Sequence, residues 1–410
     1  MKNYNTTTLT NGLRIIHLPS ASPVVYCGIG IAAGSRHEAA GEEGVAHFCE
    51  HMSFKGTRQR TSIQILNALE SVGGDLNAFT NKEDTTYYAA IQKEHFSRAV
   101  DLLTDIVFSS QYPEREVEHE VDVICDEIES YNDSPAELIY DIFENQLFEG
   151  HPLGHNILGT REQVQQFTSQ HALRFTRRHY RPDNAIFFAY GDVNFPRLVK
   201  LLEQKTAHAA ERTSTPEPDL PPSSPATSSL APFAPENHHQ AHVMLGCRSF
   251  SYDDERRMPL FLLNNILGGP GMSARLNLTL RERYGLVYTV ESTMASYSDT
   301  GMWSIYFGCD PHDVKRCLRL VRRELDKVMQ KPLSPNALRT AKQQLKGQIA
   351  IACDNREQFA LDFGKSFLHY GWEKNVDRLF ESIDKVTAED IQKVANELLA
   401  TDRLYTLIFK

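Results

Sequence analysis

The chain has 410 residues, of which 41% are hydrophobic and 23% charged, a balance typical of globular proteins that excludes wholesale disorder and a fibrous repeat. Its length predicts two or three domains. With 43 basic and 53 acidic residues the net charge is −10, so the chain lacks the basic surface that nucleic acid or an anionic membrane would attract.

Signals for membrane insertion and secretion are missing from the sequence. No stretch approaches the roughly 18 consecutive apolar residues of a membrane span. Residues 1–12 are polar and lack the apolar centre of a signal peptide. The seven cysteines are an odd number and include no Cys-x-x-Cys pair, a pattern typical of reduced thiols. We therefore expect a cytoplasmic protein without membrane or nucleic-acid partners.

Alternating β-rich and helical patterns run along the N-terminal half. Asn11-Gly12 separates two β-rich runs and is a hairpin signal. Apolar residues at helical spacing predict the helices, and Pro113 suits the first turn of a long one. Strands flanked by helices, with hairpins, favour α+β layers over a doubly wound sheet. The predicted strands are 24–33, 87–91 and 185–190, and the predicted helices are 44–55, 62–72, 96–108 and 113–131.

A change in composition divides the chain. Residues 213–235 contain seven of the nineteen prolines, mixed with Ser, Thr, Ala and Glu. Such a stretch cannot bury enough apolar surface to order itself. We interpret 213–236 as a linker between a first domain, 1–212, and a second domain, 237–410.

The two predicted domains share a pattern. The pair Asp84-Thr85 precedes an aromatic residue, and so does Asp299-Thr300, 215 residues later. Apolar residues at helical spacing follow in both copies, in 96–107 and in 314–325. We therefore predict a duplicated α+β domain, each copy with an antiparallel-rich sheet flanked by helices.

The motif His47-Phe48-Cys49-Glu50-His51 carries the clearest chemical signal. On a helix the two histidines are one turn apart, and Glu50 lies on the same side, within an arc of about 100°. Phe48 and Cys49 then face the opposite, packing side. A catalytic zinc ion takes three protein ligands of the imidazole, carboxylate or thiolate type. The competing interpretation is a chance spacing of two surface histidines among sixteen.

A third ligand has to come from another element. The predicted helix 113–131 is rich in glutamate, and Glu120 and Glu127 line one edge of its apolar stripe. A carboxylate at the edge of a buried stripe is half-shielded and needs a cationic partner. Glu118 and Glu129 line the other edge, so periodicity leaves both pairs open. A solvated helix face accounts for most of the glutamates.

Glu127 follows His51 by 76 residues, and with this spacing the motif resembles that of the inverted zincins of the pitrilysin/insulinase family. The chain is similar to the branch with the mitochondrial processing peptidase β subunit and its bacterial relatives. The resemblance covers nearly the whole chain. It includes Gly-Gly-Asp-Leu-Asn-Ala-Phe-Thr at 73–80, Pro-Asp-Asn at 182–184, the glycine-rich 268–276, and Leu-Arg-Glu-Arg-Tyr-Gly-Leu-Val-Tyr at 280–288.

This resemblance implies a metal site and a reaction. His47, His51 and Glu127 would hold one zinc ion per chain, and Glu120 would steady the ligands from behind. Glu50 would be the general base, which takes the proton of the zinc-activated water that attacks the peptide bond and passes it to the leaving amine. The implied protein is a zinc metalloendopeptidase that hydrolyses peptides or unfolded segments inside a closed chamber.

The resemblance also implies substrate contacts. Asn77 and Ala78 would lie on an edge strand that pairs with an extended peptide, although taken alone they fit an ordinary loop–strand junction. Arg281 would hold substrate carbonyls and Tyr288 would support the tetrahedral intermediate, although taken alone they fit a surface arginine and a core tyrosine. No His-x-x-Glu-His occurs after the linker, so the second domain is expected to bind substrate without catalysing.

Assembly follows from the same resemblance. Larger members of the family carry four such domains that close around the substrate, whereas two are expected here. The resemblance therefore implies a homodimer in which the Arg281/Tyr288 pair serves the zinc site of the partner, with a heterodimer with a related chain as the alternative. A second functional hypothesis is a non-catalytic assembly subunit, as some relatives in respiratory complexes are. The intact set of zinc ligands and base favours the peptidase.

Overall fold

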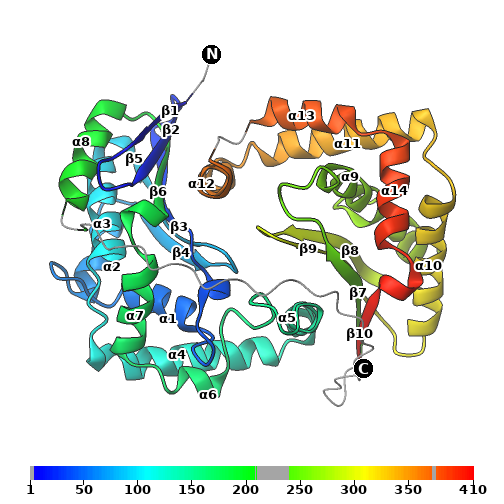
Figure 1. Ribbon diagram of the computed structural model, residues 1–410, viewed down its shortest axis with the longest axis horizontal. Helices are drawn as coiled ribbons and strands as arrows, with labels where there is room; N and C mark the ends of the chain where they lie inside the picture. The colour runs from blue at the N-terminus through cyan, green and yellow to red at the C-terminus, as the bar shows by residue number, and fades with distance from the viewer. Residues whose placement is uncertain (1–3, 208, 210–239, 372–374) are drawn as a thin grey trace. The chain divides into compact units, whose positions relative to one another are not determined.

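The computed structural model describes residues 4–207, 209, 240–371 and 375–410. The chain forms two compact units, each drawn from both halves of the sequence (Figure 1). The linker predicted at 213–236, and with it both predicted domain boundaries, lies outside the described residues. Unit 1 consists of Met1–Ser130, His155–Leu220 and Ala352–Lys374, and unit 2 of Tyr131–Gly154, Pro221–Ile351 and Asn375–Lys410.

Unit 1 is built on a six-stranded sheet with the order β1-β2-β6-β3-β5-β4. β2 and β6 run parallel, and the other neighbours are antiparallel. The predicted Asn11-Gly12 turn joins β1 and β2, and Gly12 has a positive φ of 90°, which glycine adopts readily. β4 forms one edge of the sheet. The strands are β1 (Asn5–Thr8), β2 (Arg14–Pro19), β3 (Val24–Ile31), β4 (Asp75–Thr80), β5 (Thr85–Gln92) and β6 (Ala185–Gly191).

The sequence of β3 explains why the two faces of this sheet take different helices. Side chains alternate across a strand, and Cys27 and Ile29 are fully buried in the larger core, on the face that α3 covers. Gly28 points to the other face, where α12 packs. A Cβ at Gly28 would lie 2.5 Å from the ring of Phe188, and one at Gly364 of α12 would lie 2.6 Å from it. Two glycines therefore make room for the phenylalanine between the sheet and α12.

Helix α12 belongs to the C-terminal half of the sequence but completes unit 1. Its residues Phe363 and Phe367 share a buried cluster with Ile16, Ile186 and Phe188 of the sheet. Without α12 this face of the sheet would be open to water. The helices of unit 1 are α1 (Val45–Ser53), α2 (Ser62–Glu70), α3 (Phe96–Phe108), α4 (Glu114–Asn132), α6 (Arg161–Val164), α7 (Ser169–His179), α8 (Phe195–Thr206) and α12 (Arg356–Tyr370).

A buried carboxylate fastens α12 to the sheet. Asp84, 1% exposed, precedes β5 and accepts hydrogen bonds from Asn81 Nδ2 at 2.9 Å and from His369 Nε2 at 3.1 Å. Lys365 Nζ lies 3.0 Å from the same carboxylate. Burial alone would raise the pKa of Asp84, but His369, Lys365 and Asn81 together lower it to about 2. The folded state therefore favours the charged form.

Unit 2 is built on a four-stranded antiparallel sheet with the order β10-β7-β9-β8. In unit 1 the strands β6-β3-β5-β4 have the same order and the same antiparallel pairing, and a long helix follows both β5 and β9. The predicted duplication is therefore confirmed, as is the predicted α+β class with two sheets flanked by helices. The strands are β7 (Ala241–Ser249), β8 (Val287–Ser296), β9 (Gly301–Cys309) and β10 (Tyr405–Phe409).

Unit 2 in turn takes a helix from the N-terminal half of the sequence. Ile139 and Phe143 of α5 are fully buried against Met244, Leu407 and Phe409 of the sheet. None of the helices in the described ranges is both long and apolar enough to span a membrane. The helices of unit 2 are α5 (Pro135–Leu147), α9 (Arg257–Gly268), the π-helix Asn277–Arg283, α10 (Val314–Gln330), α11 (Pro335–Ala352), α13 (Val376–Lys385) and α14 (Ala388–Leu398).

We predict that Asp84→Asn destabilises unit 1, because the charged acceptor for Lys365 and His369 is lost. Hydrogen bonds to charged groups contribute about 1.5–3 kcal/mol, and urea unfolding at pH 7 should show a loss in that range. Since the pKa of Asp84 is lowered from 3.8 to about 2, its stabilisation is complete above pH 3.8 and is lost as the pH falls toward 2. The difference in free energy of unfolding between wild type and variant should therefore decrease as the pH is lowered from 3.8 to about 2.

The matched control is Asp192→Asn. Asp192 accepts from Lys93 Nζ at 2.6 Å, but both side chains are about half exposed, and exposed ion pairs contribute little. At pH 7 the control should have the same urea unfolding midpoint as the wild type. Equal unfolding midpoints for Asp84→Asn and Asp192→Asn would contradict the anchoring role.

Candidate metal centre

Helix α1 has one apolar and one polar face, as the sequence predicts. Phe48 and Cys49 are fully buried in the core of unit 1. His47, Glu50 and His51 come from the other side of the helix, and the two imidazole ring centroids lie 4.6 Å apart. Because the packed face holds the helix in place, the imidazoles have little freedom to separate.

The structure brings His47 and His51 of α1 together with Glu127 of α4. Each offers one ligand atom, and these atoms lie within 4.8 Å of one another. Glu127 Oε2 is 3.8 Å from His47 Nε2 and 3.6 Å from His51 Nε2. Zinc with ligand distances of about 2.1 Å in a tetrahedral site separates its ligand atoms by about 3.4 Å. The three side chains therefore fit a zinc ion by both spacing and donor type.

The electrostatics of the cluster favour a cation. Burial and the neighbouring His51 lower the pKa of His47 to about 4, so its imidazole is neutral, the form that binds metal. Burial alone would lower the pKa of His51, but hydrogen bonds to Glu120 and Glu127 and the charge of Glu50 raise it to about 9. The carboxylates around His51 therefore draw positive charge to this position, and a divalent cation would supply it.

Glu120 fixes the orientation of His51. It is 3% exposed, and its Oε2 lies 3.3 Å from His51 Nδ1 while its Oε1 contacts Lys55 Nζ. Burial alone would raise the pKa of Glu120, but the bonds to His51 and Lys55 lower it overall, so the carboxylate accepts from Nδ1. That leaves His51 Nε2 directed at Glu127, the arrangement in which an outer carboxylate orients a metal-binding histidine.

The other edge of α4 plays no part in this cluster. Glu118 is exposed, and Glu129 forms an ion pair with Arg161. Of the two pairs that periodicity left open, Glu120 and Glu127 are the ones whose carboxylates lie beside the histidines of α1. Lys55 was not singled out from the sequence, because nothing in its spacing connects it to Glu120.

Glu50 is held by the end of the edge strand. It is 9% exposed, and Thr80 Oγ1, at the end of β4, donates to its Oε2 at 2.5 Å. Burial raises the pKa of Glu50, although the bond from Thr80 opposes the shift. Thr80 ends the 73–80 segment singled out from the sequence, but its contact with Glu50 could not be derived from spacing.

Asn77 and Ala78 lie on β4, at the edge of the sheet. They pair with Tyr88 and Tyr87 of β5, and no described strand pairs with the outer side of β4. β4 also packs against α1. An edge strand without a described strand on its outer side therefore runs beside α1, and the backbone N–H of Ala78 donates to Asn77 Oδ1 at 3.1 Å.

Arg281 and Tyr288 lie in unit 2 and contact each other. The Arg281 guanidinium stands over the Tyr288 ring, 5.4 Å from its centroid. Tyr288 is 79% exposed, so the interpretation as a core tyrosine is wrong. Tyr288 lies in an irregular part of β8, where the register with β9 shifts between Val287 and Val290.

The duplicated unit lacks a comparable cluster among its described residues. The offsets of 215 to 218 between the copies carry His47 to α9, at Leu262, Leu263, Asn264 and Asn265, of which the two leucines are fully buried. The same strand topology therefore occurs in unit 1 with the cluster of two histidines and a glutamate, and in unit 2 without a comparable cluster among the described residues.

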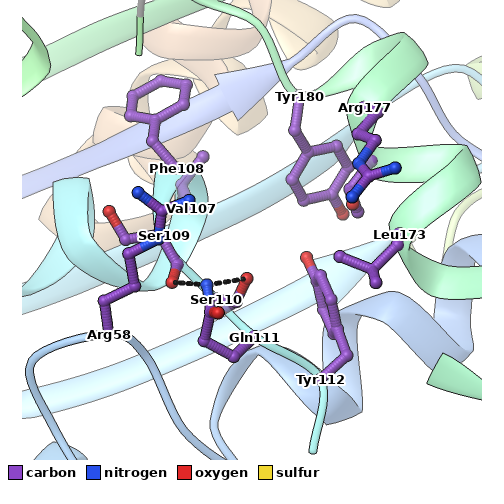
Figure 2. A pocket seen from close by; sticks show the side chains of 11 residues that line it. Arg58, Val107, Phe108, Ser109, Ser110, Gln111, Tyr112, Leu173, Arg177 and Tyr180 are labelled. Atoms are coloured by element: carbon purple, nitrogen blue, oxygen red, sulfur yellow. Dashed lines mark hydrogen bonds between the residues drawn. The ribbon is translucent and has the colours of Figure 1, made fainter. Parts of the chain in front are cut away.

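A cavity of about 220 Å³ lies elsewhere in unit 1 (Figure 2). Figure 2 shows the rings of Tyr112 and Tyr180 on one side of it and Arg58 on the other. Its lining includes no histidine, cysteine or acidic residue, so it offers no metal ligand. The hydroxyl of Tyr180, one of the lining residues, lies 3.0 Å from that of Tyr87, which lies 3.0 Å from Ser53 Oγ at the end of α1. This hydroxyl chain supports the helix from its packed side.

Comparisons with known proteins agree with this geometry. The family described as "Insulinase (Peptidase family M16)" matches residues 15–161, and "Peptidase M16 inactive domain" matches residues 166–345. An "uncharacterized zinc protease" of Streptomyces coelicolor is 34% identical over 402 residues, which cover 96% of this chain and 86% of that protein.

Solved structures show the same fold. A protease from Helicobacter pylori superposes with a TM-score of 0.92 at 22% identity, covering 99% of both chains. A chain of complex III2 from Candida albicans superposes with a TM-score of 0.84 at 18% identity, covering 99% of this chain and 95% of that one. Since the family matches span most of the sequence and include the whole metal motif, the chain belongs to the insulinase family of zinc metallopeptidases, M16.

Proposed function

We propose that the protein is a zinc-dependent endopeptidase with one zinc ion per chain, held by His47, His51 and Glu127. The observation that carries this proposal is the convergence of the three ligand atoms within 4.8 Å, beside a separate buried carboxylate, Glu50. A metal site alone would not need that extra carboxylate. The names of the relatives as zinc proteases support the same conclusion.

Zinc bound at this site would supply a water of pKa near 7 and polarise the carbonyl of the scissile bond. Glu50 is the general base: it accepts the proton of the attacking water and delivers it to the leaving amine. Burial raises the pKa of Glu50, which brings the base closer to neutral pH, where proton transfer is efficient. Thr80 holds one carboxylate oxygen, and Glu120 keeps His51 in the binding tautomer.

The substrates are peptides or unfolded segments. An extended chain can add itself to the unpaired edge of β4 by backbone hydrogen bonds near Asn77 and Ala78. A segment inside a folded protein cannot do so, because its backbone groups are already paired. The edge strand therefore favours substrates without stable structure.

A homodimer would complete the site. Arg281 and Tyr288 form an exposed pair on unit 2, suited to bind backbone carbonyls and to donate to a tetrahedral intermediate. In the two-chain chamber this pair serves the zinc site of the partner. A heterodimer with a related chain would use the same surfaces.

A non-catalytic assembly subunit is the second candidate, and the likeness to a chain of complex III2 favours it. That likeness concerns the fold, since identity is 18%. An assembly role would not require Glu50, Glu120 and Glu127 to surround two imidazoles, so the peptidase is the better supported function.

We also propose a cytoplasmic location. All seven cysteines lie within the described residues and none forms a disulfide. Free thiols persist in a reducing compartment.

We predict that the purified protein contains one zinc ion per chain and that His51→Ala loses it, because two ligands bind zinc much more weakly than three. Elemental analysis measures this directly. The matched control is His119→Ala, which removes an exposed histidine of α4 and should keep the metal. A folded wild type that binds no zinc when zinc is supplied would sink the proposal.

We predict that Glu50→Gln keeps zinc but loses peptide cleavage by at least about 10²-fold, since general-base catalysis contributes about 10² to 10⁴-fold. Cleavage of an unstructured peptide and the zinc content are measured on the same sample. Glu118→Gln, on the exposed side of α4, is the control and should keep both. Cleavage by Glu50→Gln at the wild-type rate shows that the base is another group.

We predict that two inactive variants restore activity when their subunits exchange. One variant is Glu50→Gln and the other is Arg281→Ala with Tyr288→Phe. If the pair acts on the partner, a mixed dimer has one site with both defects and one intact site, so activity returns toward about half of wild type. If subunit exchange is demonstrated and no activity returns, the pair does not act across the dimer; a monomer at working concentration excludes the chamber.

A further inference from the structure

The start of helix α1 lacks a side-chain cap of its own. Its N-cap residue is Gly44, with a positive φ of 100° and no side chain to accept hydrogen bonds. The first backbone N–H groups of a helix have no partner within the helix and need one elsewhere. Here the acceptor is Glu38: Gly44 N donates to its Oε2 at 2.9 Å and Ala46 N to its Oε1 at 2.8 Å. A carboxylate six residues before the N-cap residue therefore replaces the missing side-chain cap.

Glu38 is itself held in place. Its side chain is completely buried, and its Oε2 lies 2.9 Å from His155 Nε2. The same Nε2 lies 3.1 Å from the carbonyl oxygen of Ser35, which can only accept, so Nε2 carries the proton and donates to both. Burial raises the pKa of Glu38, and the bonds from His155, Ala46 and Gly44 oppose that shift. A buried carboxylate with three donors is a fixed group.

The segment that carries Glu38 also holds the turn between β4 and β5. Ser35 N donates to the Asn81 carbonyl at 3.1 Å, and Arg36 N donates to that of Lys82 at 2.8 Å. A Cβ at Gly34 would lie 2.0 Å from the Asn81 oxygen, so only glycine permits this approach. Thr80, which binds Glu50, directly precedes that turn. Segment 34–38 thus contacts both the start of the metal helix and the strand end that holds the base.

The position of these contacts determines what they control. Ala46, whose N–H is bound by Glu38, directly precedes His47, and α1 has only nine residues. The third ligand, Glu127, belongs to a different helix. A movement at the start of α1 would therefore shift both imidazoles relative to Glu127. Metal sites tolerate deviations of only about 0.2 Å in ligand distance.

We propose that Glu38, oriented by His155, is a positioning residue of the metal centre: by capping α1 it sets His47 and His51 against Glu127. The inference rests on the proposed zinc site and assigns a role to a residue outside the zinc motif. The competing interpretation is a cap that only stabilises the fold.

The test measures zinc affinity of the full chain by competition with a chromogenic chelator. Glu38→Ala leaves both helix N–H groups without an acceptor and should weaken zinc binding about tenfold or more, the range seen when residues behind metal ligands are removed. Glu38→Gln fills the same volume and keeps one acceptor oxygen. Its zinc affinity should therefore lie between those of the wild type and Glu38→Ala. In the cobalt-substituted protein, the visible absorption should change in the same order, because it reports ligand geometry.

The matched control is Asn194→Ala, which removes another helix cap of unit 1. Asn194 Oδ1 accepts from Arg197 N at 3.0 Å at the start of α8, away from the metal cluster. It should lower the melting temperature and leave zinc affinity unchanged. If Glu38→Ala does not fold, Glu38→Gln carries the comparison alone.

Three outcomes overturn the proposal. Glu38 variants that lose thermal stability but bind zinc within twofold of wild type show a cap that only stabilises. An equal loss of affinity in Asn194→Ala shows a general effect of stability. A wild type that binds no zinc overturns this inference and the proposed function together, whereas one that binds zinc without cleaving peptides overturns the proposed activity only.

Discussion

The concentration of negative charge between α1 and α4 is the constraint on which the site depends. Glu50 and Glu120 are buried and Glu127 is partly so, all close to two imidazoles. Burial raises the pKa of Glu50, and the charge of Glu127 raises it further, a repulsion that a cation near both carboxylates would relieve. Among the ion pairs of the described residues, Lys55 pairs with Glu120, whereas Glu127 faces the imidazoles of His47 and His51. A divalent ion bound at the imidazoles would remove this repulsion, and its binding would then stabilise this part of the unit.

The second unit shows that the topology does not create the chemistry. Both units share a four-strand order with the same antiparallel pairing, yet the counterpart of the metal helix carries Leu262 and Leu263 in its core. One copy of the fold carries two histidines and a glutamate on that helix, whereas the matching positions of the other copy hold leucines and asparagines. Function therefore follows from a few residues placed on a shared frame.

The sequence predicted what depends on local spacing and left open what depends on packing. The helix that carries His47 and His51 could be predicted because its pattern follows the helical period of about 3.6 residues. The duplicated strand–helix pattern could be predicted because it recurs after about 215 residues. Spacing alone could not choose Glu120 and Glu127 over the glutamates on the opposite edge of α4. The two edges of the apolar stripe of a helix are equivalent until another element of the fold packs beside one of them. Glu38, Lys55 and Thr80 reach the site through contacts between separate elements, and no periodicity reports such contacts.

Composition also could not predict that each half of the sequence contributes a helix to the unit built mainly from the other half. A linker marks where the backbone is extended and polar, but it does not tell which segment covers which sheet. Here α12 closes the glycine-bearing face of the sheet in unit 1, and α5 packs on the sheet of unit 2. Asp84, noticed in the sequence only as a repeat marker, is the charge that holds α12. One face of β3 packs against α12, and its other face packs against the core that contains α1. The candidate metal centre therefore depends on residues 356–370. These residues follow the zinc motif by about three hundred positions in the sequence. The C-terminal half of the sequence, which has no zinc motif, therefore contributes one helix to the core of the unit that carries the motif.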